Sequence, residues 1–234
     1  MDHARVRALL FDLDGTLVDT ESHTDATIAT VVARHGVAGF ALPPTETRGR
    51  TWAHVADVIR ARAAIDVPAA TLAAELLRHW NAATAAVQPV PGAPEALRAA
   101  AAHGLQLAIV SSSPRAVIAR FIDQLGVAAQ VDPRLCVGGD DVRHGKPDPE
   151  GFLRAARTLE VDPSEALVFE DSRAGLLAAR AAGMRSMFVT CCAVDIEEIA
   201  PLATASCTDY RSLPPGLWGE LQSGALDLSG RSFP

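Results

Sequence analysis

Short apolar segments that alternate with helical patterns constrain the fold of this chain more than any other feature of its sequence. The segments predicted as buried strands are 7–12, 105–111, 134–138, 166–170 and 185–190, of which 134–138 is the weakest. The helical patterns between them include 94–104, 150–161 and 172–183. Strands that are apolar on both faces and alternate with helices are typical of a parallel sheet covered by helices on both faces. The sequence therefore predicts an α/β fold.

The alternation is interrupted between about residues 17 and 89, where no convincing strand occurs. Helical patterns occupy 24–36, 51–63 and 68–84, and prolines separate them. We therefore predict an all-helical domain, 17–89, inserted into a core formed by 1–16 and 90–234. The tail 223–234 is predicted to be loose, and the LPPGLW sequence before it to form a short packed turn.

Composition and charge argue against several partners. The 234 residues carry a net charge of -7, whereas nucleic acid is bound by clustered cations. The Ala-rich runs are short and interrupted, so we expect no membrane span, and the apolar run near the start is too short for a signal peptide. We expect a cytoplasmic monomer or small homo-oligomer. The 4 cysteines include no C-x-x-C pair, so we expect reduced thiols and no zinc site.

Lysine usage singles out one position. The chain has 21 Lys and Arg residues, and Lys146 is the only lysine among them. Lysine provides a compact ammonium, whereas arginine provides a planar guanidinium that stays charged. A chain that otherwise uses arginine is therefore expected to need an ammonium at this position, the alternative being an ordinary surface lysine.

Charged and polar side chains follow the predicted strands. Asp12 and Asp14 end the first strand, Ser111 the second, and Glu170-Asp171 the fourth. Because the carboxyl ends of parallel strands share one edge, these groups are expected to meet in one cleft, together with Lys146. Four carboxylates cannot stay ionised side by side without compensation, and Mg²⁺ suits a site of oxygen ligands and phosphate. We therefore predict a site for a phosphate dianion between Mg²⁺ and the ammonium.

The D-x-D spacing has a direct chemical use. Residues i and i+2 of an extended strand point the same way. Asp12 is the candidate nucleophile, which would become an aspartyl phosphate, and Asp14 the candidate acid to the leaving oxygen and base to water. Gly15 allows a sharp turn and a close backbone approach. Alone, this motif is equally consistent with a strand that ends in an Asx turn. The lysine and the Glu-Asp pair favour catalysis.

FDLDGTLVDTE, IVSSS, GKPDP and FEDSRAGLLAARAAGM resemble the four motifs of the haloacid-dehalogenase-like hydrolase superfamily, in the family's order and over essentially the whole chain. The resemblance implies a Rossmann-like core and a mobile helical cap, with hinges near 17–19 and 89–92. It also implies a role for each motif residue. These are Asp12 as nucleophile and metal ligand, Asp14 as acid/base and backbone metal ligand, Glu170 and Asp171 as the rest of the metal site, and Gly15, Ser111, Ser112 and Lys146 at the phosphate.

The resemblance leaves two branches of the family open. Asp14 disfavours the branch that cleaves carbon–halogen bonds, and the lack of a cap lysine disfavours the branch that cleaves phosphonates. A phosphomonoesterase and a β-phosphoglucomutase-like isomerase remain, and both form an aspartyl phosphate. The mutase pattern has a cap histidine where this chain has Thr24, with His23 one residue earlier. In favour of the mutase, Ser113 and Arg115 could hold a second phosphate, although Arg115 is equally consistent with a helix residue that faces solvent.

The cap stretch TRGRTWAHV is predicted to reach the cleft. Arg48 and Arg50 would suit an anionic or polyol substrate, and Trp52 could pack on a sugar face. The alternative is a tryptophan in the cap core and solvated arginines. We therefore predict a Mg²⁺-dependent phosphomonoester hydrolase of small phosphorylated metabolites, such as hexose phosphates or 6-phosphogluconate. The alternatives are the isomerase and a non-catalytic binding protein on the same scaffold.

Overall fold

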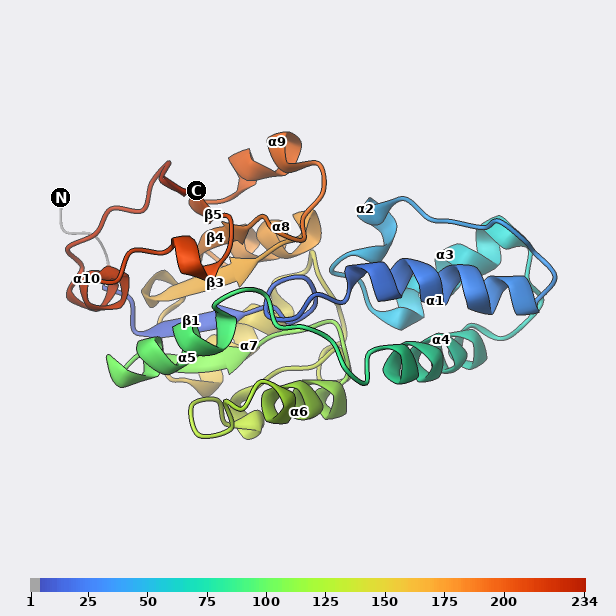
Figure 1. Ribbon diagram of the computed structural model, residues 1–234, viewed down its shortest axis with the longest axis horizontal. Helices are drawn as coiled ribbons and strands as arrows, with labels where there is room; N and C mark the ends of the chain where they lie inside the picture. Colours follow the sequence, from blue (N-terminus) through green and yellow to red (C-terminus); the bar gives the residue numbers. More distant parts are fainter. Residues whose placement is uncertain (1–4) are drawn as a thin grey trace.

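The computed structural model describes residues 5–234 and contains a parallel sheet with the strand order β2-β1-β3-β4-β5-β6 (Figure 1). The strands are β1 (Ala8–Phe11), β2 (Gln106–Ile109), β3 (Ala166–Glu170), β4 (Arg185–Val189), β5 (Ala205–Cys207) and β6 (Ser232–Phe233). The predicted α/β fold is confirmed. Strand β1 lies between β2 and β3, so the chain adds β2 on one side of β1 and then crosses to add β3 on the other. Parallel sheets bind ligands beyond the carboxyl ends of the strands at such a reversal.

Alternating side chains of β1 enter two different hydrophobic clusters. Leu9 and Phe11 belong to one cluster, and Ala8 and Leu10 belong to the other, on the opposite face of the sheet. Helices α5 (Ala93–Ala102), α6 (Arg115–Gln124) and α10 (Leu217–Ser223) pack into the first cluster, and α7 (Glu150–Thr158) and α8 (Arg173–Ala181) into the second. Both faces of the sheet are therefore covered by helices, as predicted. The remaining short elements are α9 (Ile196–Ile199) and the 3-10 turns η1 (Pro133–Leu135), η2 (Pro163–Glu165), η3 (Ala200–Leu202) and η4 (Tyr210–Ser212).

The inserted helices form a cluster of their own. They are α1 (Glu21–Arg34), α2 (Pro44–Thr47), α3 (Trp52–Ala63) and α4 (Ala69–Ala83). They pack around buried side chains such as Ile28, Ile59 and Leu76, to one side of the sheet (Figure 1). We refer to these helices and their connections as the cap. The two segments that join the cap to the core run side by side, because Asp19 N donates to Gln88 O at 3.0 Å and Val90 N to Leu17 O at 2.9 Å.

Two local predictions were wrong, and a third was correct but incomplete. Residues 134–138 do not form a strand: Asp132 caps the turn η1, and only Val137 bridges to the sheet, at Val110. The tail is not loose, since it contains β6, which pairs with β5. The packed turn near residue 215 continues into helix α10, which buries Trp218. Among residues 5–234, none of the helices has the length and the apolar character that a membrane span requires.

Candidate active site

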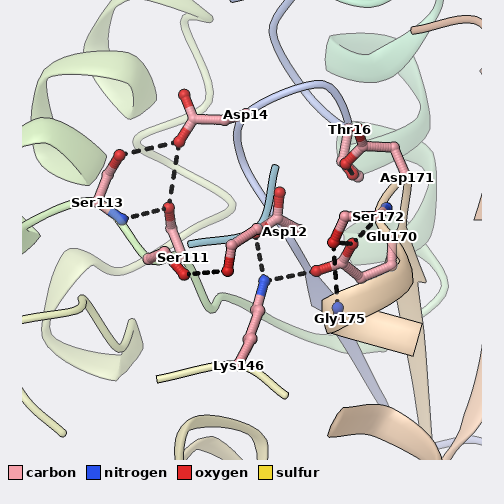
Figure 2. Close-up of polar contacts among 12 residues, drawn as sticks. Asp12, Asp14, Thr16, Ser111, Ser113, Lys146, Glu170, Asp171, Ser172 and Gly175 are labelled. Carbon is pink, nitrogen blue, oxygen red and sulfur yellow. Dashed lines mark hydrogen bonds and ion pairs between the residues drawn. The ribbon is translucent and has the colours of Figure 1, made fainter. Parts of the chain in front are cut away.

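The predicted nucleophile and the only lysine meet in a buried ion cluster. Asp12 follows β1 directly, and the Lys146 ammonium donates hydrogen bonds to Asp12 and, at 2.6 Å, to Glu170 Oε1 at the end of β3 (Figure 2). Burial alone would lower the pKa of Lys146, but attraction by these two carboxylates outweighs it and raises the pKa. The ammonium therefore stays charged. Burial raises the pKa of Asp12 well above its usual value, against the attraction of the ammonium.

Asp14 lies among hydroxyl donors. Thr20 Oγ1 donates to Oδ1 at 2.9 Å, and Ser113 Oγ donates to Oδ2, also at 2.9 Å. Ser111 Oγ reaches the same Oδ2 at 3.4 Å (Figure 2). Burial raises the pKa of Asp14, and the hydroxyl hydrogen bonds oppose that rise. A carboxyl group that holds its proton more readily than usual, next to a nucleophile, suits a general acid.

Asp12, Glu170 and Asp171 form a set of oxygen donors whose ligand atoms lie within 4.8 Å of one another. In Asp171, Oδ1 accepts a hydrogen bond from Thr16 Oγ1 at 3.0 Å, whereas Oδ2 is buried and has no hydrogen-bond partner among the described residues. Burial and the charge of Glu170 raise the pKa of Asp171 well above its usual value. A buried, unpartnered carboxylate oxygen beside two other carboxylates fits a hard cation such as Mg²⁺.

Gly15 determines how closely the backbone approaches this cluster. Its φ is +82°, and a Cβ there would lie 2.2 Å from Asp171 Oδ2. Any larger residue would therefore clash with the carboxylate and also be strained.

Sequence reasoning missed Ser172, which holds Glu170. Its backbone N and its Oγ both donate to Glu170 Oε2 at 2.9 Å, while its Oγ accepts from Gly175 N at 3.1 Å as the N-cap of α8. Both oxygens of Glu170 are thus engaged by protein donors. Position 175 requires glycine, because a Cβ on Gly175 would lie 1.7 Å from Glu170 Oε1. A serine before a helical pattern is a typical N-cap signal, and it could have pointed to Ser172.

A cavity lies between the acidic cluster and the cap. Its core side includes Asp12, Asp14, Ser112 and Ser113, and its cap side includes Thr24, Arg50, Trp52 and Trp80. The two tryptophan rings meet edge to face, with centroids 6.1 Å apart. Thr24 Oγ1 accepts a hydrogen bond from the Trp80 indole N–H at 3.1 Å. The lining combines apolar side chains with a few polar groups, as ligand sites usually do.

Not every predicted specificity residue reaches this cavity. His23 lies outside the lining, with its ring 3.4 Å from Ser22 Oγ. Arg115 is also outside it and pairs with Asp141 at 3.0 Å. Arg48 joins the cap to the core, because it pairs with Glu21 at 3.3 Å and donates to the carbonyl oxygen of Cys192.

Comparison with known proteins assigns the family. The model of the haloacid dehalogenase-like hydrolases matches residues 6–183. The chain is 35% identical, over 187 residues, to validoxylamine A 7'-phosphate phosphatase from Streptomyces hygroscopicus subsp. limoneus, covering 76% of this chain and 83% of the relative. It is 32% identical, over 201 residues, to N-acetylmuramic acid 6-phosphate phosphatase from Pseudomonas aeruginosa, covering 81% and 84%.

The fold agrees with the sequence relationship. A crystal structure of β-phosphoglucomutase from Clostridium difficile matches with a TM-score of 0.78 and 20% identity, over 94% of this chain and 98% of that one. At this identity the likeness concerns the fold alone. The family model, the phosphatase relatives and the assembled carboxylates agree, and the chain therefore belongs to the haloacid dehalogenase-like hydrolase family, as a phosphoric monoester hydrolase.

Proposed function

We propose that this protein is a Mg²⁺-dependent phosphatase of small phosphorylated metabolites, and that Asp12 carries the phosphoryl group during turnover. The observation that supports this most is the joint placement of Asp12, Asp14 and Lys146 at one sheet edge. In this proposal the core consists of residues 1–16 and 90–234 and the cap of residues 17–89. The protein would act in the cytoplasm as a monomer or small homo-oligomer.

The first step forms the aspartyl phosphate. An oxygen of Asp12 attacks phosphorus, the bond from phosphorus to the ester oxygen breaks, and Asp14 donates its proton to that leaving oxygen. Lys146 holds Asp12 in place and offsets the negative charge that gathers around the phosphoryl group. When bound at Asp12 and Asp171, with the Asp14 carbonyl that the family resemblance implies, Mg²⁺ supplies further positive charge to that group.

The second step returns the enzyme to its starting state. Asp14, now ionised, takes a proton from a water molecule, whose oxygen attacks phosphorus. The bond between phosphorus and Asp12 breaks, and inorganic phosphate leaves. Thr20 and Ser113 keep the Asp14 side chain in position through both steps, because each donates a hydrogen bond to it at 2.9 Å.

The cap side of the cavity supports a sugar or polyol as the leaving group. Trp52 and Trp80 offer apolar surface, and Thr24 offers a hydroxyl. Relatives named as phosphatases of validoxylamine A 7'-phosphate and of N-acetylmuramic acid 6-phosphate support a phosphorylated metabolite as the substrate. Hexose phosphates and 6-phosphogluconate are therefore the first candidates.

A phosphosugar isomerase is the second candidate, since the fold matches β-phosphoglucomutase. The isomerase needs a second phosphate site and a cap acid/base. Thr24 stands where the mutase pattern has histidine, and His23 lies outside the cavity lining. Ser113 donates to Asp14, and Arg115 is paired with Asp141. These contacts favour water over a sugar hydroxyl as the acceptor. The intact catalytic set likewise disfavours a non-catalytic role.

The test is phosphate release from a panel of hexose phosphates, 6-phosphogluconate and phosphoglycolate with Mg²⁺, run beside conversion of β-glucose 1-phosphate to glucose 6-phosphate. We expect release from one or a few sugar phosphates, lost with a chelator. Asp12→Asn should abolish release, while Asp66→Asn, an exposed aspartate in the cap, should leave it intact. Fast isomerisation with weak release would favour the second candidate, and an active Asp12→Asn variant would contradict the covalent mechanism.

A further inference from the structure

The cap segment Gly49-Arg50 is seated on three loops of the core. Gly49 O accepts a hydrogen bond from Ser112 Oγ at 2.8 Å. Arg50 donates from its terminal nitrogen to Lys146 O at 3.0 Å. The third core loop contains Ser172, which is so close that a Cβ on Gly49 would lie 2.5 Å from Ser172 Oγ. These loops carry Lys146 and the serines next to Asp14, and Ser172 holds the Glu170 carboxylate at the end of β3. The segment is therefore in direct contact with the residues proposed for phosphoryl transfer.

Arg50 has donor capacity that the protein does not use. One terminal nitrogen binds Lys146 O, but Nε is buried and has no hydrogen-bond partner among the described residues. An unpaired buried N–H group is costly, so such a donor is expected to meet an acceptor in the working complex. The side chain lines the same cavity as Asp12, Asp14 and Ser113. A ligand in that cavity can supply the acceptor.

Among the described residues that line the cavity, Arg50 is the only cation. Other cations close to the cavity are engaged elsewhere. Lys146 is shared by two carboxylates, Arg48 binds Glu21 and a carbonyl, and Arg120 binds the end of α4 through Thr84 O and Thr84 Oγ1. A phosphate dianion that enters between the carboxylates Asp12 and Asp14 would need a further cation, and Arg50 is positioned to provide it.

We propose that Arg50 is a catalytic residue supplied by the cap, and that its guanidinium donates hydrogen bonds to oxygens of the transferring phosphoryl group. The planar fork of arginine suits two phosphoryl oxygens at once. Arg50 is anchored on the carbonyl of Lys146, whose ammonium holds the nucleophile. The apolar part of the cavity lining consists of Trp52, Val55 and Trp80. This proposal rests on the proposed function and ties phosphoryl transfer to the seating of the cap.

The experiment compares Arg50→Ala, Arg50→Lys and Arg34→Ala, a half-exposed arginine of the cap outside the cavity. We expect Arg50→Ala to lower kcat/KM about 100-fold for every ester, whether its leaving group is neutral or acidic. The lysine variant should retain part of the activity, and added guanidinium ion should restore part of the activity of Arg50→Ala. Binding of inorganic phosphate in the presence of Mg²⁺, measured by ³¹P NMR, should weaken in parallel. Arg34→Ala should match the parent in both measurements.

Two results would overturn the inference while leaving the proposed function standing. One is kcat/KM within about threefold of the parent for Arg50→Ala on all esters, with unchanged phosphate binding. The other is a loss confined to esters with a second acidic group, which would place Arg50 on the leaving group. If circular dichroism shows that Arg50→Ala does not fold, Arg50→Lys provides the test. Parent-like kinetics of Arg50→Lys on all esters would contradict a bidentate contact between Arg50 and the phosphoryl oxygens. Absence of Mg²⁺-dependent release by the parent enzyme would instead defeat the proposed function.

Discussion

Lys146 and Glu170 are joined by a 2.6 Å hydrogen bond although they come from a loop and from the end of β3, respectively. The same ammonium also binds Asp12, and all three side chains are at least nine-tenths buried. Glu170 is held in turn by the backbone and hydroxyl of Ser172. The position of the nucleophile therefore depends on a chain of contacts that starts at the first turn of α8, and not on Asp12 alone.

Removing the ammonium from this cluster should cost both stability and activity. Lys146→Met would leave Asp12 and Glu170 buried without their shared cation, which is expected to lower the free energy of unfolding by about 3–5 kcal/mol. Phosphate release should fall to background. Urea denaturation of the variant and of Arg34→Met, a half-exposed control, measures the difference. Equal unfolding free energies for Lys146→Met and the parent would show that the cluster does not stabilise the fold.

Metal binding should be visible without turnover. Asp171 has a buried carboxylate oxygen without a hydrogen-bond partner among the described residues. Burial raises the pKa of Asp171, and the nearby carboxylates raise it further. Saturating Mg²⁺ should therefore raise the Tm, by an amount that corresponds to about 2–3 kcal/mol at a hundredfold excess over Kd. Asp171→Asn should abolish the rise, and Asp66→Asn should retain it. A Tm of the parent that is unchanged by Mg²⁺ would argue against a metal site at this cluster.

The pair Glu21–Arg48 predicts a specific dependence of stability on pH. Burial raises the pKa of Glu21 to about 8, although Arg48 opposes the rise. Between the unfolded pKa near ~4.3 and about 8, the folded chain binds a proton that the unfolded chain has released, so this group makes stability fall as pH increases. Glu21→Gln stays neutral throughout. The stability of Glu21→Gln relative to the parent should therefore increase from pH 5 to pH 8, by on the order of 1–3 kcal/mol, and then level off.

Urea denaturation at several pH values checks this dependence. Carboxylates far from Glu21 contribute equally to both proteins and cancel in the difference, and Asp66→Asn serves as the surface control. Loss of one hydrogen-bond acceptor for Arg48 adds a constant offset to the Glu21→Gln difference. A difference that stays flat across this range would show that Glu21 is ionised in the folded protein throughout.

The core of the fold could be predicted because its strands are apolar on both faces. β1, β3 and β4 lie within their predicted segments, since runs such as ALLF and ALVF leave no alternative to burial. β5 and β6 have only three and two residues, and their pairing depends on neighbours far away in the sequence. Residues 134–138 look like a strand but follow Asp132 and Pro133, whose turn chemistry prevails.

The residues of the site also fall into a group that the sequence pattern predicts and a group that it does not. Residues at strand ends, such as Asp12 and Glu170, are brought together by the parallel topology, and that topology was readable. Thr20 and Gly49 act through contacts that no local pattern marks, whereas Ser172 lies two residues from Glu170 and its N-cap position could have been read from the sequence. The stretch TRGRTWAHV was predicted to reach the cleft. Arg50 lines the cavity and binds Lys146 O, whereas Arg48 lies outside the cavity lining and binds Glu21 and Cys192 O.

Seating of the cap can be tested at Gly49, which has a matched control elsewhere in the cap. Gly49 and Gly36 both have positive φ, at +67° and +86°. A Cβ on Gly49 would lie 2.5 Å from Ser172 Oγ, whereas a Cβ on Gly36 would meet nothing within 4 Å. Alanine at either position adds backbone strain of about 1 kcal/mol. Only Gly49→Ala should also push the cap away from Ser172 and disturb the serine that holds Glu170.

We therefore expect Gly49→Ala to lose at least as much stability in urea as Gly36→Ala, and the two variants to differ clearly in catalysis. Gly49→Ala should lower kcat by at least about tenfold, because a small displacement of catalytic groups is costly. Gly36→Ala should keep the parent rate. Small-angle scattering should show a larger radius of gyration for Gly49→Ala in the presence of Mg²⁺ and inorganic phosphate. Equal rates for the two variants would mean that contact between the cap segment and Ser172 is not needed for phosphoryl transfer.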